Sequence, residues 1–141
     1  MPLTPYLILN GKAEEALAFY RAALGGNVEI VRYKDAPSEE QGTAELAEQV
    51  MHGRLTAANG VALGVMDAPP ERGGEPGSNF TLSFETADEA QAREVFDKLA
   101  AGGRITWPFG KTFFADAFGM ISDKYGATWM VNCRAAVPAA S

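Results

Sequence analysis

A chain of 141 residues, of which 47% are hydrophobic and 21% charged, has the composition of one globular domain, which argues against collagen, a coiled coil or a disordered chain. Its 18 acidic and 12 basic residues give a net charge of −6 without a basic run, which argues against nucleic-acid binding. A single cysteine, Cys133, excludes an internal disulfide and fits a reducing compartment. Because the sequence shows neither a signal-peptide pattern nor an apolar window of about 18 residues, we expect a cytoplasmic protein with no membrane partner.

The first half of the chain predicts one strand, one helix and three further strands. In chain order these are strand 5–9, helix 12–24 and strands 28–33, 49–58 and 61–66, with a loop insert at 35–48. The helix is predicted from apolar residues at i, i+3, i+4 and i+7, which are Ala16, Phe19, Tyr20 and Ala23. The pair Gly25-Gly26 ends it, because glycine suits a left-handed C-terminal cap.

The second half repeats this order after a linker rich in proline and glycine, residues 68–78. It predicts strand 79–84, helix 87–101 and strands 104–108, 119–123 and 128–132. The apolar stripe of this helix consists of Ala92, Val95, Phe96 and Leu99. Thr86 with Glu89 predicts a capping box at its start, and Gly102-Gly103 follows its end.

A weak internal repeat supports two modules of the same build. The segment Ala13-Glu14-Glu15-Ala16 recurs as Ala87-Asp88-Glu89-Ala90, 74 residues later, and each copy opens a predicted helix between strands. We therefore predict an α+β fold of two βαβββ modules, with module 1 at 3–67 and module 2 at 79–133. Both lie in one domain, 1–134, followed by a frayed tail, 134–141.

The order and spacing of several short motifs resemble the PhnB-like branch of the glyoxalase/bleomycin-resistance, or vicinal oxygen chelate (VOC), superfamily. The motifs are Pro5-Tyr6-Leu7, Ala13-Glu14-Glu15-Ala16-Leu17, Phe19-Tyr20, Leu24-Gly25-Gly26, Met51-His52 and the closing stretch from Phe113 to Trp129. The resemblance covers residues 3–132. It implies the glyoxalase/bleomycin resistance/dioxygenase-like fold, with mixed curved sheets that each carry a helix on the convex face, and it implies a homodimer. Two departures are Phe114, where this branch usually has Trp, and Asp123-Lys124-Tyr125-Gly126, where it usually has Asp-Pro-Phe-Gly.

The resemblance also implies where a metal site is to be sought. Metal-dependent members of the superfamily place ligands on the first and last strands of each module. Family spacing and the internal repeat put these positions at Pro5, Gly64, Asn79 and Met130. Proline and glycine have no side-chain donor, asparagine is a weak ligand, and a thioether suits soft ions. We therefore expect no metal and no other cofactor.

Strand alternation selects a tentative ligand-binding set, because every second side chain of a strand shares one face. His52 and Arg54 share a face of the third strand, as do Asn79, Thr81 and Ser83 in the fifth. The full set is His52, Arg54, Asn79, Thr81, Ser83, Phe114 and Met130. For His52 and Arg54 two interpretations stay open: an anion- or carbonyl-binding pair in a pocket wall, or two soluble side chains on an outer strand face.

Three functions remain compatible with the sequence. We predict a metal-independent small-molecule binding protein, homodimeric and with an unknown ligand. The first alternative is a glyoxalase-like lyase or isomerase, or an antibiotic-conjugating transferase, which needs a metal site that the sequence does not show. The second alternative is a drug-sequestering resistance protein, which performs no chemistry. No residue is assigned a catalytic role, because the sequence contains no GxSxG, GxGxxG or Walker motif.

Overall fold

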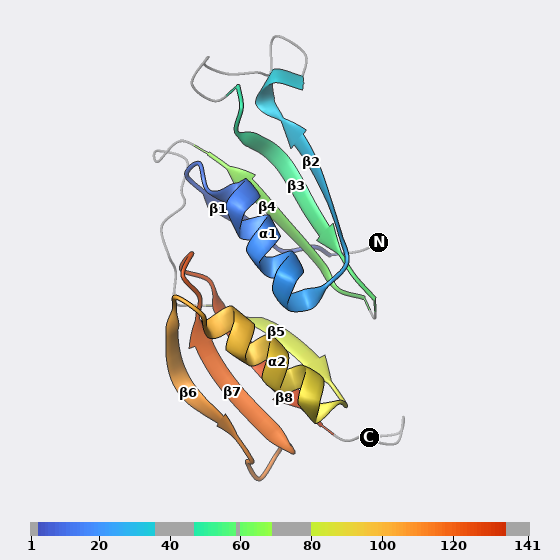
Figure 1. The fold of residues 1–141 in the computed structure, drawn as a ribbon, viewed down its shortest axis with the longest axis vertical. Helices are drawn as coiled ribbons and strands as arrows, with labels where there is room; N and C mark the ends of the chain where they lie inside the picture. Colours follow the sequence, from blue (N-terminus) through green and yellow to red (C-terminus); the bar gives the residue numbers. More distant parts are fainter. Residues whose placement is uncertain (1–2, 36–46, 59, 69–79, 135–141) are drawn as a thin grey trace. The chain divides into compact units, whose positions relative to one another are not determined.

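The structure, a computed structural model, describes residues 3–35, 47–58, 60–68 and 80–134. The chain divides into two compact units, Met1–Glu75 and Pro76–Ser141, and each contains one helix and one four-stranded sheet (Figure 1). No helix in the described part of the chain is both long enough and apolar enough to cross a membrane.

The first unit has the order β1 (Tyr6–Leu9), α1 (Ala13–Leu24), β2 (Asn27–Arg32), η1 (Tyr33–Asp35), β3 (Val50–Thr56) and β4 (Ala62–Asp67). Its sheet order is β1-β4-β3-β2, in which β1 and β4 are parallel and the other two pairs are antiparallel. Helix α1 packs on one face of this sheet, against β2, β3 and β4 (Figure 1). The opposite face carries no element of this unit among the described residues.

The core of the first unit lies between α1 and the sheet. Leu17 and Tyr20 of α1 are fully buried against Leu55 of β3 and Val65 of β4, which are equally inaccessible to solvent. Each such side chain stabilises the fold by about 1.5–3 kcal/mol relative to an exposed position. This packing fixes which face of every strand is covered, and therefore which face remains for a ligand.

The second unit has the order β5 (Leu82–Thr86), α2 (Glu89–Ala100), β6 (Arg104–Gly110), β7 (Ala117–Ser122) and β8 (Thr128–Cys133). Its sheet order is β5-β8-β7-β6, again with one parallel pair, β5 with β8. Helix α2 buries the predicted stripe of Ala92, Val95, Phe96 and Leu99 against this sheet. The prediction of two βαβββ modules in an α+β fold is confirmed.

Two details of the predicted repeat are wrong. The helices begin at Ala13 and Glu89, so they lie 76 residues apart, whereas the matching tetrapeptides are 74 apart. The start of α2 is also capped differently, because its cap is the carboxylate of Asp88, which accepts a hydrogen bond from the Gln91 backbone N–H at 3.2 Å. Thr86 supports this cap by accepting a hydrogen bond from the Asp88 N–H, so Thr86 and Glu89 form no capping box.

Several predictions concern segments outside the described residues. Most of the loop insert 35–48 belongs to these segments, and so do the linker from residue 69, Asn79 and the tail from residue 135. The interpretation of residues 1–134 as one domain with these boundaries stays a prediction.

Candidate functional site

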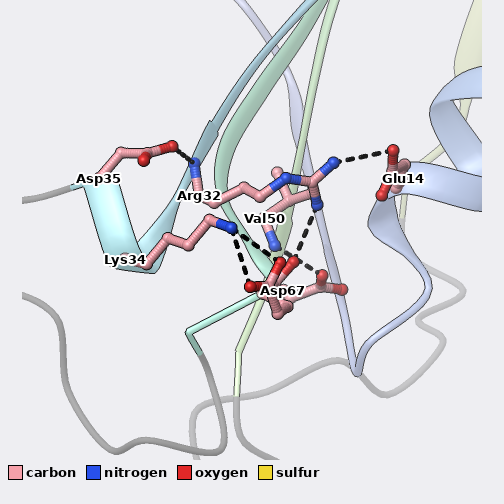
Figure 2. A network of polar contacts seen from close by, with 7 residues as sticks. Glu14, Arg32, Lys34, Asp35, Val50 and Asp67 are labelled. Carbon is pink, nitrogen blue, oxygen red and sulfur yellow. Dashed lines mark hydrogen bonds and ion pairs between the residues drawn. The ribbon is translucent and has the colours of Figure 1, made fainter.

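A buried carboxylate, Asp67, organises one end of the first unit. Its side chain is 2% exposed, and its Oδ1 accepts hydrogen bonds from the backbone N–H groups of Gly11 at 2.8 Å and Ala13 at 2.9 Å. Its Oδ2 accepts another from the Val50 N–H at 3.0 Å, drawn in Figure 2. The cap residue of α1, Lys12, makes no side-chain capping bond. Asp67 therefore takes over the helix cap from a distant strand and joins β4 to both α1 and β3.

Charged side chains near this end form a solvated network instead of a catalytic group (Figure 2). Arg32 pairs with Glu14 at 2.9 Å and donates to the Glu48 carbonyl, and Lys34 pairs with the Glu48 carboxylate at 2.8 Å. The hydrogen bond from Arg32 lowers the pKa of Glu14, and that from Lys34 lowers the pKa of Glu48. Both carboxylates are thus held in the ionised, acceptor-only form, which suits ion pairing and not general acid catalysis.

The face of the first sheet opposite α1 carries His52 and Arg54. Both alternate along β3 with Gly53 and Leu55, which are buried on the helix side. The prediction that His52 and Arg54 share one face, away from the helix, is confirmed. Whether this face lines a pocket or faces solvent depends on their neighbours.

Tyr6 is the neighbour that the sequence analysis missed. Its hydroxyl is hydrogen-bonded to His52 Nδ1 at 2.7 Å, and the two rings stack with centroids 5.5 Å apart. Strand β4 lies between them, and its Gly64 is in register with Tyr6 on one side and with Arg54 on the other. The sequence contains a signal for this placement. Leu7 and Leu9 of β1 are buried on the helix side, so strand alternation puts Tyr6 on the opposite face.

One donor of Arg54, its Nε, lacks a hydrogen-bond partner among the described residues. This atom is enclosed by protein. Glu29 lies directly opposite Arg54 on β2, yet these two charges form no ion pair in the described part of the chain. A desolvated donor without an acceptor is costly, so Arg54 is the residue of this face that has most to gain from a further hydrogen bond.

The remaining candidate residues lie in the second unit. Ser83 and Met130 are in register on neighbouring strands, and Trp129 and Val131, which alternate with Met130, are buried on the helix side. Thr81 has an enclosed Oγ1 without a partner among the described residues. Phe114 is 41% exposed and packs edge to face on Phe118, with centroids 5.0 Å apart. The structure thus joins Ser83 to Met130 but divides the predicted set between two units, and a common hollow stays a prediction.

The expected metal positions stay a prediction, and one of them, Asn79, lies outside the described residues. The strand register places Gly64 opposite Tyr6 and Met130 opposite Ser83, which gives four groups on paired first and last strands. The four groups do not fit a divalent ion, because they supply neither an imidazole nor a carboxylate. Within the described ranges, no group of three His, Cys, Asp or Glu residues is placed to hold a metal ion.

These features define the class of the protein: two βαβββ units, each with a helix packed on its four-stranded sheet, form the glyoxalase-like fold of the VOC superfamily. Residues 2–132 match the family model described as 3-demethylubiquinone-9 3-methyltransferase, and the chain belongs to this PhnB-like family of the superfamily. The resemblance inferred from the sequence motifs is confirmed.

Individual relatives agree with this assignment. Protein YjdN of Escherichia coli K12 is 34% identical in an alignment of 140 residues. The alignment covers 94% of this chain and 95% of YjdN. The crystal structure of PA1353 from Pseudomonas aeruginosa has a TM-score of 0.85 and 35% identity, with 96% and 99% of the two chains covered. A putative 3-demethylubiquinone-9 3-methyltransferase, the PhnB protein from Bacillus cereus, has a TM-score of 0.68 and 30% identity, with 94% and 99% covered.

Proposed function

We propose that this chain is a homodimeric, metal-independent small-molecule binding protein whose site is the uncovered face of the β1-β4-β3-β2 sheet. The observation that carries the proposal is the unpartnered Nε of Arg54 on the same strand face as the hydrogen-bonded pair of Tyr6 and His52. These three polar side chains from two strands lie on the face of the sheet that α1 leaves uncovered.

The chemistry of these groups selects the ligand class. Arginine presents several N–H donors in a fixed plane and binds carboxylate or phosphonate oxygens in a bidentate way. The Tyr6 hydroxyl and the His52 ring add further O–H and N–H groups beside it. A small ligand that carries a carboxylate, a phosphonate or a carbonyl oxygen therefore matches this face.

Two observations support binding without a metal. The ring of Tyr6 fills the space above Gly64, one of the positions at which family spacing and the internal repeat place a metal ligand. The residues at the equivalent positions of the second unit, Ser83 and Met130, are a hydroxyl and a thioether, which are poor ligands for a borderline divalent ion. The proposal accordingly needs no metal for affinity.

Thermal unfolding in the presence of simple anions tests the proposal. Methylphosphonate, pyruvate and acetate are titrated into the protein with and without EDTA, because a ligand at 100 times its Kd stabilises the fold by about 2.7 kcal/mol. We expect at least one of these probes to raise Tm equally with and without the chelator. Arg54→Gln abolishes that rise, whereas Arg93→Gln on the exposed side of α2 keeps it.

Two results contradict the proposal. The first is a Tm increase that Arg54→Gln leaves intact, because the anion then binds elsewhere. The second is a Tm increase that EDTA removes, because a metal ion then takes part. The Tm of Arg54→Gln without ligand is expected to stay close to that of the parent protein, since the lost Nε has no hydrogen bond to lose.

A further inference from the structure

The loop between β6 and β7 borders a hollow in the second unit. Residues 111–116 of this loop line it together with Arg134, which follows β8, and its volume is about 290 Å³. Pockets for small molecules usually have volumes of about 300–1,000 Å³, so this hollow suits a ligand of one or two rings.

The loop is held in shape by its own hydrogen bonds. The Thr112 side-chain oxygen accepts from the backbone N–H groups of Phe114 at 3.3 Å and Ala115 at 3.1 Å. The Thr112 N–H donates in turn to the Ala115 carbonyl at 3.2 Å. These hydrogen bonds hold the turn in one conformation within four residues. A ligand that binds there does not have to order the loop first, which lowers the entropic cost of binding.

Aromatic side chains form the apolar part of this wall. Phe114 packs edge to face on the buried Phe118 and also on Phe113, at centroid distances of 5.0 and 5.2 Å. Phe113 is 99% exposed and Phe114 is 41% exposed, which leaves ring surface free for contact with a ligand. Large exposed apolar side chains at a hollow are typical of a binding site.

Two cations complete the lining. Lys111 and Arg134 form no ion pair with any residue that the structure describes. Asp116 is the acidic side chain in the lining, and it is not free, because it already takes part in a contact within the protein. The hollow therefore combines exposed aromatic rings with two cationic side chains and one acidic side chain.

We infer that this hollow binds a small aromatic carboxylate. The ligand ring packs against Phe114 and Phe113, and its carboxylate accepts charge-assisted hydrogen bonds from Arg134 and Lys111. The site lies entirely in the second unit, whereas Tyr6, His52 and Arg54 belong to the first, so the inference does not depend on the function proposed above.

Isothermal titration calorimetry with 2-naphthoate tests the inference on the full chain. The neutral 2-naphthalenemethanol lacks the carboxylate, and cyclohexanecarboxylate lacks the aromatic ring, so each omits one half of the proposed contacts. We expect 2-naphthoate to bind at least tenfold more tightly than either analogue. Arg134→Gln weakens 2-naphthoate about tenfold or more, in keeping with hydrogen bonds to charged groups.

Variants separate this site from others. Phe114→Leu is expected to weaken 2-naphthoate more than cyclohexanecarboxylate, and the exposed Arg104→Gln on β6 is the matched control that changes neither. Equal binding of 2-naphthoate and its alcohol contradicts the inference, and so does an affinity that Arg134→Gln leaves unchanged. Loss of binding in Arg54→Gln with retention in Arg134→Gln assigns the anion to the first sheet and likewise overturns it.

Discussion

The ring of Tyr6 lies directly above Gly64, so closely that a Cβ at position 64 would clash with Cε2 and Cζ of that ring. No larger residue fits at position 64 while Tyr6 keeps its place. Tyr6 reaches across β4 to form a hydrogen bond with His52. This contact between β1 and β3 therefore requires glycine at position 64.

We therefore predict that Gly64→Ala displaces Tyr6 and costs about 1–3 kcal/mol of unfolding free energy, as overpacking does. Urea unfolding measures the cost, and the His52 ring signals in proton NMR report the lost hydrogen bond. Gly110→Ala is the control, because a Cβ there meets nothing within 4 Å, and it is expected to change stability by less than about 0.5 kcal/mol.

A second background makes this prediction specific. In Tyr6→Ala the ring is absent, so adding Gly64→Ala is expected to cost little further stability. If Gly64→Ala is as destabilising in Tyr6→Ala as in the parent protein, the Tyr6 ring is not the cause.

The buried Asp67 gives a prediction about stability. Asp67→Asn keeps the shape but replaces one accepting oxygen by an N–H₂ group that faces the N–H donors of Gly11 and Ala13 or of Val50. We expect a loss of about 1.5–3 kcal/mol, measured by urea unfolding. Asp35→Asn, whose side chain is exposed and accepts one bond at 3.4 Å, is expected to be nearly neutral. Equal effects of the two substitutions contradict the role assigned to Asp67.

The ion pair of Arg32 and Glu14 gives a prediction about pH. Its hydrogen bond lowers the pKa of Glu14 below 4.5 in the folded protein. The pair therefore contributes stability above pH 4.5, and this contribution is lost as pH falls through the lowered pKa. We expect Arg32→Gln and Glu14→Gln to flatten the acid limb of Tm against pH to the same small extent, with no further change in the double variant. A steeper limb in either single variant contradicts this.

Cys133 is expected to resist thiol reagents in the folded protein. Its side chain is 1% exposed, and burial raises the pKa of its thiol, with smaller contributions from Glu89, Asp116 and Asp88. Because the pKa of this thiol in the folded protein lies above its ordinary value of 9.0, its contribution to the stability of the fold is fully present below that pH and is lost as pH rises through the folded pKa. Labelling with a thiol-specific reagent at pH 8 is expected to be slow without urea and rapid with it. Complete labelling of the native protein within mixing time contradicts the prediction.

The proposed homodimer predicts a measurable mass. Ile8 and Val31 lie on the uncovered face of the first sheet at 37% and 42% exposure, and Trp107 of β6 is 47% exposed. Apolar residues of this kind are commonly covered by a partner. We expect light scattering to give about twice the chain mass of 15.0 kDa, and a monomer across the whole accessible concentration range refutes the dimer.

The sequence by itself determined the elements and their faces. Helices α1 and α2 follow from apolar residues with a period of 3.6, and the shared face of His52 and Arg54 follows from strand alternation, because both periodicities are properties of the local backbone. The repeat of the βαβββ order was also visible, although its matching tetrapeptides misplaced the start of α2 by two residues.

The tertiary structure decided which distant residues meet. Tyr6 and His52 are 46 residues apart, and Asp67 caps a helix that begins 54 residues earlier in the chain. These contacts exist because β4 lies in the sheet between β1 and β3. In this order β1 and β3 lie on either side of Gly64 of β4. Local sequence patterns carry no information about that insertion or its register, and so they predicted the faces of the strands but not the pair of Tyr6 and His52.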